Sequence, residues 1–430
     1  MKAQFNSLFL LIISLVFTIP INAQIDSVYQ KHLLDSLRQV NLIEQKAQLK
    51  ALKIARSKFL KNLDTYPSDS AFKLDISNMG FDVFPDISRF TNITYIQASG
   101  NNLRDIRLSS KNIKHLEVLD IRENNIETLH IGKAPNLKNA YLAANPLKRI
   151  PFSFVFNKKL EMIDISKTQI SLLPWWLKYK KNITELIING GIFEINNRNN
   201  RRMRQLKTLT LAHLKVDSLP NSFSKLHKLE RLTIAYTHLH SLPDNFYKLK
   251  NLNTLILYSD AFHNIPTICY KLPKLKHLDF YFNSIRTIPN GIQQLENLEY
   301  LYLSFNQISI LPPDIQNIKR LKYLYLHHNN IENTPQWLGQ LDSLEILDMG
   351  FNDIDTLTDL SNLKNLAEVD FQNNQLNHFP FQLLELPKTR LIYLSNNPFV
   401  MNYSEQQKLK RLSKEFAKRG GHLILVNKKE

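Results

Sequence analysis

The chain has 430 residues, of which 43% are hydrophobic, 22% charged and 10% aromatic, and its formal net charge is +17. This composition is typical of a folded protein and excludes a wholly disordered chain. Ten glycines are too few for a protein built on several glycine-rich phosphate-binding loops. The single cysteine, Cys269, excludes an internal disulfide framework and any zinc or iron–sulfur site made of several cysteines.

Residues 1–23 have the pattern of a secretory signal peptide. Lys2 precedes an apolar run over residues 8–19, and a small residue, Ala23, stands at the expected cleavage site. The run is shorter than the roughly 20 residues that a membrane-spanning helix needs, so an anchor is the weaker alternative. We therefore expect an exported protein located in the periplasm, at the cell surface or in the medium.

Residues 24–70 are predicted to form a helical N-terminal cap. Ser27 and Gln30 fit a capping box, and the helix is expected to run to about Leu63 and to stop before Pro67. Its apolar positions recur at three- and four-residue spacings, at Leu33, Leu37, Val40, Ala47, Ala51 and Ile54. This stripe is expected to pack on the first repeat of a monomer. The alternative is the seam of a coiled-coil dimer.

A fixed period begins at residue 71 and continues to residue 402. It is clearest over 298–312, where Leu298, Leu301 and Leu303 precede Asn306 and a Leu-Pro step ends at Pro312. The first leucine recurs every 23 residues, at 206, 229, 252, 275, 298, 321 and 344. Steps of 21 to 23 residues extend the pattern outward to about fifteen units, starting at 71, 93, 116, 137, 160, 183, 366 and 389 in addition.

Each unit predicts a strand, a bend and a return segment. Leu301 and Leu303 alternate with Tyr302, which is the two-residue period of a strand, so Tyr302 points away from the leucines. Pro312 ends regular pairing, and Ile315 and Ile318 suit one turn of helix or 3₁₀ helix. A single unit cannot bury enough apolar surface to fold alone, so the units must stack and both ends must be covered.

The motif resembles the leucine-rich repeat, in the 23-residue Leu-Pro class of Ras-suppressor-like and plant disease-resistance-like proteins. The resemblance implies an α/β solenoid whose curved parallel sheet lines the concave face, and a protein that binds other molecules. It also implies a continuous ladder of asparagines at the position of Asn306, where a side-chain amide satisfies backbone groups of the bend. The ladder is interrupted at Thr168, Gly191, Leu214, Thr237 and Asp260, so the middle of the solenoid is expected to be less regular.

Residues 403–430 are predicted to form a helix–strand C-terminal cap. Ser404 precedes a helix to about Lys418, Gly420 and Gly421 end it, and residues 422–426 form a final strand. Helical caps without cysteines resemble those of bacterial exported repeat proteins. Both caps are basic, and Arg198, Arg201, Arg202 and Arg204 form a third basic cluster. These charges are either solvated surface or attract an anionic envelope surface or glycan; export argues against nucleic acid.

Units eight to thirteen carry many aromatic residues at outward strand positions. Twelve residues are predicted to form a ligand-binding set: Tyr236, Tyr258, His277, Asp279, Tyr281, Tyr300, Tyr302, Phe305, Tyr323, Tyr325, His327 and Asp348. Six strands at about 4.8 Å spacing span roughly 24 Å, enough for an extended peptide of about seven residues. Phe282, His328 and Phe351 belong to the same units. In the alternative interpretation the aromatics only favour strands, and the phenylalanines before the asparagines pack along the sheet edge.

The leading functional hypothesis is a non-enzymatic scaffold that binds a protein or peptide on the concave face. A cell-surface glycan-binding module that uses the same aromatics is the second hypothesis, and an enzyme is the third. We find no nucleophile elbow, no phosphate loop and no metal-ligand spacing, so no catalytic residue, metal or cofactor is predicted. His327 and His328 are a weak metal alternative, and Cys269 aligns with Ile292 and Ile315 at an inward core position.

Overall fold

A computed structural model of the chain describes residues 46–47, 49–69 and 72–425. The chain divides into two compact units, Met1–Tyr66 and Pro67–Glu430, which are considered separately. The first contains a helix that ends at residue 65, close to the predicted end. The predicted signal peptide, the capping box at Ser27 and the stripe from Leu33 to Val40 lie outside the described residues. Among those that are described, no helix is both long and apolar enough to cross a membrane.

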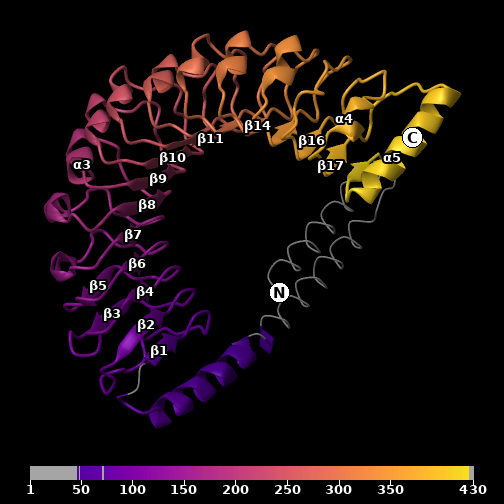
Figure 1. Cartoon of the computed structure of the whole chain (residues 1–430). Helices are drawn as coiled ribbons and strands as arrows, with labels where there is room; N and C mark the ends of the chain where they lie inside the picture. Colours follow the sequence, from indigo (N-terminus) through magenta and orange to yellow (C-terminus); the bar gives the residue numbers. More distant parts are fainter. Residues whose placement is uncertain (1–45, 48, 70–71, 426–430) are drawn as a thin grey trace, which may run out of the picture. The chain divides into compact units, whose positions relative to one another are not determined.

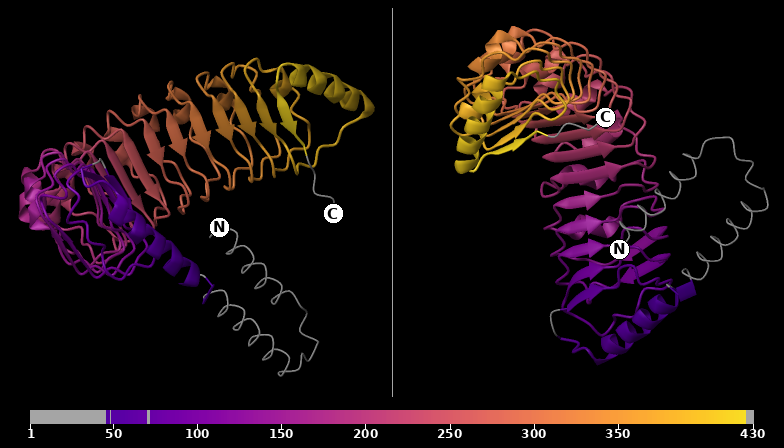
Figure 2. Two further views of the ribbon diagram at one scale, coloured as in Figure 1. Left: turned by 90° about the horizontal axis from the view of Figure 1, so that it is seen from below. Right: turned by 90° about the vertical axis from the view of Figure 1, so that its right-hand side faces the viewer.

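The second unit is built on one sheet of sixteen strands, paired in parallel in chain order (Figures 1 and 2). Fifteen strands come one from each predicted repeat, and β18 follows them. They are β1 (Phe72–Asp75), β2 (Ile93–Gln97), β4 (Val118–Asp120), β6 (Asn139–Tyr141), β7 (Met162–Asp164), β8 (Glu185–Asn189), β9 (Thr208–Ala212), β10 (Arg231–Ala235), β11 (Thr254–Tyr258), β12 (His277–Asp279), β13 (Tyr300–Tyr302), β14 (Tyr323–Tyr325), β15 (Ile346–Asp348), β16 (Glu368–Asp370), β17 (Leu391–Tyr393) and β18 (His422–Ile424). The predicted α/β solenoid is confirmed.

The sheet lines the inner side of an arc, and the return segments form its outer side (Figure 1). Most return segments are short 3₁₀ helices: η1 (Phe152–Phe156), η2 (Trp175–Tyr179), η3 (Asn221–Lys225), η4 (Phe246–Lys248), η5 (Thr267–Lys271), η6 (Ile292–Gln294), η7 (Pro313–Asn317) and η8 (Gln336–Gln340). The proline of the Leu-Pro step directly precedes several of them, as Pro312 does for η7. Proline suits this position because its φ is fixed and the N–H that it lacks would have no helical partner.

Two neighbouring units form a second, smaller sheet on the return side. It consists of β3 (Asp105–Leu108) and β5 (Thr128–Ile131), which pair in parallel. In unit six the return segment is an α-helix, α3 (Asn197–Arg202), and near the C-terminal end it is α4 (Gln382–Glu385). The sequence analysis predicted neither the second sheet nor the exchange of 3₁₀ for α-helix.

The repeated leucines fill the space between the sheet and the return segments. Leu298, Leu301 and Leu303 are fully buried, as are their counterparts in the neighbouring units. Phenylalanines add volume between units, and the rings of Phe223 and Phe246 stack 6.5 Å apart. Cys269 is buried within η5, and burial raises the pKa of its thiol, so the predicted core role is confirmed.

The asparagines form the ladder that their position predicted. Asn306 is typical: its Nδ2 donates to the carbonyl oxygen of Phe280 at 3.0 Å and to that of Leu303 at 2.9 Å. Its Oδ1 accepts the N–H of Ile285 at 2.9 Å. One buried amide thus satisfies backbone groups of its own unit and of the preceding unit, which joins the bends of successive units.

The expectation that the middle of the solenoid is less regular is wrong for the sheet. The strands β8 to β11 have five residues each, whereas β12 to β15 have three, and β8 pairs with β9 in unbroken register. Where asparagine is missing, short side chains take over part of its role. The Thr168 hydroxyl donates to Ile165, and Asp260 Oδ1 accepts both the N–H and the hydroxyl of Thr237.

The C-terminal segment consists of α5 (Tyr403–Lys418) and β18. The helix begins two residues earlier than predicted, because Asn402 rather than Ser404 is the N-cap and forms a capping box with Glu405. Gly420 has a φ of 78° and ends the helix, and β18 then pairs in parallel with β17. Val426 lies outside the described residues.

Candidate functional site

Outward side chains stack in columns because each strand is in register with the next. Tyr300 pairs with Tyr323, and Tyr302 pairs with Tyr325, between β13 and β14. Their ring centroids are 4.5 and 4.6 Å apart, and the planes within each pair differ by 5°. We name these four rings the tyrosine plate. His277 on β12 extends it, since its ring lies 5.4 Å from Tyr300 and 5.0 Å from Tyr302.

A second row of rings follows the strand ends, at the residue before the asparagine. We name it the aromatic ridge; its members are Tyr236, Phe282, Phe305, His328 and Phe351, with φ between 52° and 59°. The equivalent residue has positive φ in all fifteen units. Five of the other ten units use glycine or asparagine there, and the remaining five use Glu123, Ala144, Lys167, His213 and Ser259. Left-handed backbone costs a residue with a Cβ about 1–2 kcal/mol, and bulky side chains adopt it rarely.

The ridge is continuous over its last four rings. Phe282 stacks on Phe305 at 5.3 Å, Phe305 on His328 at 4.0 Å and His328 on Phe351 at 4.2 Å. Exposure remains large along the ridge, at 48% for Tyr236, 51% for Phe282 and 41% for Phe351. The phenylalanines do lie along the sheet edge, but they offer much of their surface to solvent.

Tyr258 and Tyr281 connect Tyr236 to the rest of the ridge across Ser259. The ring of Tyr258 lies 5.0 Å from that of Tyr236 and 5.3 Å from that of Tyr281. The Tyr281 ring in turn lies 5.1 Å from that of Phe305. The aromatic members of the twelve predicted residues thus adjoin one another in two groups across five neighbouring units.

The two predicted aspartates also shape the turns. Asp279 Oδ1 accepts the N–H of Tyr281 at 2.7 Å, and Asp348 Oδ1 accepts that of Gly350 at 3.2 Å. Each contact fixes the turn into the left-handed residue that follows. Burial raises the pKa of Asp279 to about 6, and burial together with the nearby Asp370 raises that of Asp348 to about 7.

Burial and hydrogen bonding favour the neutral forms of several histidines and tyrosines of this face. Burial lowers the pKa of His327 to about 4 and also lowers that of His277. The Tyr323 hydroxyl donates to Glu345 at 3.0 Å, which raises the pKa of Tyr323 to about 12. His277 Nε2 is buried without a hydrogen-bond partner among the described residues.

The two adjacent histidines contact each other rather than a cluster of ligands. His327 Nδ1 lies 3.0 Å from His328 Nδ1, and His327 Nε2 lies 3.9 Å from Asp348 Oδ2. Within residues 46–425, masked positions apart, no group of three or more histidine, cysteine, aspartate or glutamate side chains is placed to hold a metal ion. The face is therefore chemically an aromatic and hydrogen-bonding surface.

Three ridge residues were not in the predicted set: Phe282, His328 and Phe351. The signal for them was their position immediately before the asparagine, which is where the backbone turns left-handed and presents the side chain beside the sheet.

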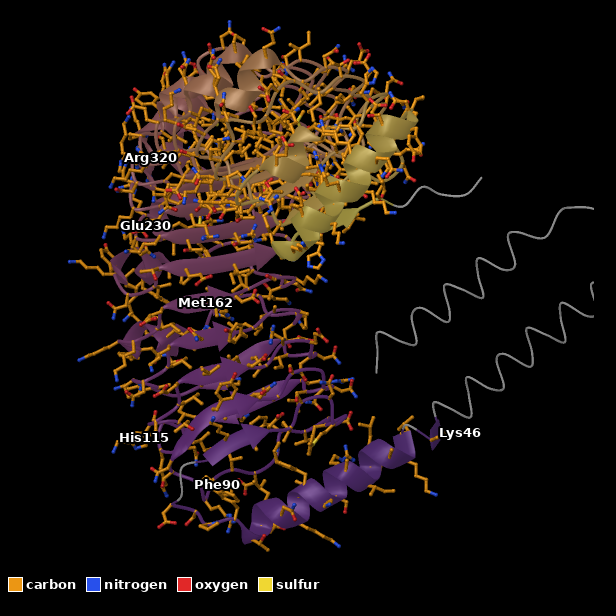
Figure 3. All side chains as sticks on the ribbon, turned by 45° about the vertical axis from the view of Figure 1, so that its right-hand side comes forward. Lys46, Phe90, His115, Met162, Glu230 and Arg320 are labelled. Atoms are coloured by element: carbon orange, nitrogen blue, oxygen red, sulfur yellow. The ribbon has the colours of Figure 1, made fainter. Side chains whose placement is uncertain are left out.

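Figure 3 shows the side chains of the described residues, with Met162 marking β7. A hollow of about 630 Å³ lies elsewhere: it is lined by residues of the segment 82–88 and by Arg104, Asp105 and Arg107.

Comparison with known proteins agrees with this architecture. Residues 263–415 match the family model described as a leucine-rich repeat region. No curated protein matches the chain. A leucine-rich repeat protein of Leptospira interrogans shares the fold with a TM-score of 0.67 at 23% identity, over 85% of this chain and 97% of that chain.

Two other solved structures share the fold at lower similarity. One is an internalin from Listeria monocytogenes, with a TM-score of 0.53 and 18% identity over 86% of this chain and 89% of that chain. The other is a plant peptide hormone receptor in complex with RGF2, with a TM-score of 0.52 and 22% identity over 72% of this chain and 56% of that chain. The repeat motif, the fifteen-unit sheet and the matched region agree: residues 263–415 match a leucine-rich repeat region, and the sheet has the fold of a leucine-rich repeat solenoid.

Proposed function

We propose that the chain is an exported, non-enzymatic scaffold that binds a protein or an extended peptide across units eight to thirteen. The observation that carries the proposal is the aromatic ridge, because exposed rings occupy left-handed positions where small residues would be more stable. Tyrosine-rich surfaces with few charges are typical of protein interfaces. The structural relatives support the same class, since one of them is a receptor solved in complex with RGF2.

The stacking geometry favours a peptide over a sugar. Within the tyrosine plate the faces of Tyr302 and Tyr325 are turned toward each other, so these two faces are covered and the ring edges remain for a ligand. A sugar ring stacks on a free aromatic face, whereas a peptide backbone accepts hydrogen bonds from hydroxyl groups and packs its side chains on ring edges. A glycan ligand is the alternative that the experiment must distinguish.

The test is a binding screen of the chain against a peptide display library and a glycan array. We expect wild-type protein to select peptides, and Tyr302→Ala with Tyr325→Ala to weaken their binding at least about tenfold, the loss of about two interface contacts. Tyr179→Ala with Tyr247→Ala, on the return side, is the matched control and should bind like wild type. Unchanged peptide binding by the plate variant would place the ligand elsewhere, and binding to glycans alone would favour the alternative.

A further inference from the structure

The return side of units four and five exposes four aromatic rings. Phe152 and Phe156 come from η1, and Trp175 and Tyr179 come from η2; their exposed fractions are 59%, 47%, 59% and 66%. We name these four residues the outer aromatic patch. Large apolar side chains exposed together on neighbouring elements are typical of a surface that meets a partner. The tyrosine plate and the aromatic ridge lie on the other side of the sheet, so this patch is independent of the proposed ligand face.

Basic residues surround the outer aromatic patch. Units four to six, residues 137–205, contain thirteen lysines and arginines and four aspartates and glutamates, a net charge of +9 out of +17 for the whole chain. Lys133 Nζ lies 4.8 Å from the centre of the Phe156 ring, and Lys178 Nζ lies 4.6 Å from that of Tyr179. More than half of the net charge thus comes from about a sixth of the sequence.

Several of these cations share one hollow without a neutralising partner. Trp175, Lys178, Arg198, Arg201 and Arg202 line a hollow of about 340 Å³ between η2 and α3. In the part of the chain that the structure describes, no carboxylate lies within ion-pairing distance of these four cations. Burial and the neighbouring charge of Arg198 lower the pKa of Arg202, as expected where like charges face one another. An anionic group in this hollow would relieve the repulsion.

We propose that the return side of units four to six binds the surface of an anionic lipid bilayer. The exposed rings would insert among the lipid headgroups while the surrounding lysines and arginines contact the phosphates. Tryptophan and tyrosine next to basic residues suit the boundary between water and hydrocarbon, because the rings are apolar at one end and polar at the other.

The ring geometry argues against a single-stranded nucleic acid as the occupant. Phe152 and Phe156 meet at 87°, and Trp175 and Tyr179 meet at 75°, so neither pair offers parallel faces on which successive bases stack. The rings are instead exposed at the tips of short helices on the outer side of the sheet. That arrangement suits shallow insertion into a membrane surface.

The test is co-sedimentation of the full chain with vesicles of phosphatidylcholine, with or without phosphatidylglycerol, at low and high sodium chloride. We expect binding only to the anionic vesicles and weaker binding at high salt. Trp175→Ala with Tyr179→Ala should weaken binding about tenfold at both salt concentrations. Lys178→Gln, Arg198→Gln and Arg201→Gln together should weaken it about a hundredfold at low salt, since each charge near the surface contributes about fivefold.

Three controls keep the result specific. Lys248→Gln, Lys271→Gln and Lys274→Gln remove the same number of charges from the return side of other units and should bind like wild type. Tyr302→Ala with Tyr325→Ala should leave vesicle binding unchanged, which separates this proposal from the proposed function. In Trp175→Phe, which keeps an aromatic ring, binding should persist while the vesicle-induced change in tryptophan fluorescence is lost.

Circular dichroism establishes that each variant is folded. No binding to anionic vesicles at low salt would overturn the proposal, and so would an equal loss in the control lysine variant. Binding to heparin or polyphosphate without binding to vesicles would also overturn it, because the partner would then be a soluble polyanion.

Discussion

The rings of Phe305 and His328 stack with centroids 4.0 Å apart and planes 11° from parallel, while both residues have left-handed backbones, with φ of 54° and 55°. Glycine and asparagine accept this conformation at lower cost, and other units of the same solenoid use them. Along the aromatic ridge the left-handed backbone therefore favours glycine or asparagine, whereas the sequence has an aromatic residue at each of these positions. Rings kept at such positions are expected to contribute to ligand contact more than to stability.

Phe351→Asn should leave the stability of the fold unchanged or raise it by up to about 1 kcal/mol. The substitution relieves part of the backbone cost of about 1–2 kcal/mol, because asparagine tolerates this conformation better although it also has a Cβ. It loses one ring contact, with His328, of about 0.5–1.5 kcal/mol. Urea denaturation measures the change. Leu347→Ala in the same unit is the control. Because Leu347 is fully buried, this substitution should lower the free energy of unfolding by about 3 kcal/mol. A loss above about 1 kcal/mol in Phe351→Asn would show that the ring stabilises the solenoid.

Asn306→Ala should lower the free energy of unfolding by about 2–4 kcal/mol. The substitution leaves the buried carbonyl of Phe280 and the N–H of Ile285 without this partner, and each lost buried contact costs about 1–3 kcal/mol. Asn297→Ala is the matched control, because both contacts of the Asn297 amide are exposed: its Nδ2 donates to the Pro273 carbonyl at 2.8 Å, and its Oδ1 accepts from Arg320 at 3.0 Å. Its expected cost is below about 1 kcal/mol. Equal urea midpoints for the two variants would mean that the ladder adds nothing beyond a surface contact.

The repeat, the inward leucines and the outward tyrosines were predictable because each follows from spacing alone. A strand period of two places Tyr302 opposite Leu301, and a constant repeat places Tyr302 beside Tyr325. The left-handed ridge could not be derived this way, since φ depends on the local turn and the sequence shows only that a residue precedes the asparagine. The same holds for the long strands β8 to β11, in whose units Gly191, Leu214, Thr237 and Asp260 stand at the asparagine position.

The second sheet and α3 were missed for a different reason. Return segments are held by contacts with neighbouring units, so their local sequence only weakly determines their conformation. Asn199, for example, is buried in α3, where its Oδ1 accepts the N–H of Leu173 in the preceding unit at 3.0 Å. A polar residue in an asparagine- and arginine-rich segment gives no sequence signal for that role.

The two adjacent glycines of unit six should respond differently to a side chain. Gly191 has a φ of 95°, and a Cβ there would lie 2.6 Å from the backbone oxygen of Thr168, which cannot move freely. Gly191→Ala should therefore destabilise the fold by about 2–4 kcal/mol, from strain and close contact together. Gly190 has a φ of 73°, and a Cβ there would meet only the flexible side chain of Lys167, at 3.4 Å.

Gly190→Asn is the matched comparison and should change stability by less than about 1 kcal/mol, since asparagine tolerates left-handed backbone. Thermal unfolding followed by circular dichroism measures both variants. If Gly191→Ala unfolds at the same temperature as Gly190→Asn, the close approach to Thr168 is not a constraint on the bend.

Asp348→Asn should stabilise the protein at high pH and have little effect at low pH. The pKa of Asp348 is raised to about 7 in the folded chain, above the value near 3.9 of an unfolded aspartate. The folded protein therefore binds more protons between about pH 4 and pH 7, and the contribution of Asp348 to stability falls as the pH rises through that window. Asparagine does not titrate, and its Oδ1 can still accept the N–H of Gly350.

At about pH 8 we expect Asp348→Asn to raise the free energy of unfolding by an amount on the order of 2 kcal/mol. This is less than the full effect of the pKa shift, because the Asp348 side chain is 21% exposed and is partly screened by water. The pKa of His327 is lowered and its contribution has the opposite sign, but His327 is present in both proteins, so the comparison isolates Asp348. Urea midpoints measured from about pH 4 to pH 8 should diverge as the pH rises, whereas Asp353→Asn, at an exposed position of the same unit, should run parallel to wild type. If the urea midpoint of Asp348→Asn instead followed the same pH dependence as that of wild type, the Asp348 carboxylate would be as well solvated in the folded chain as in the unfolded one. The face around Tyr325 would then be open to water.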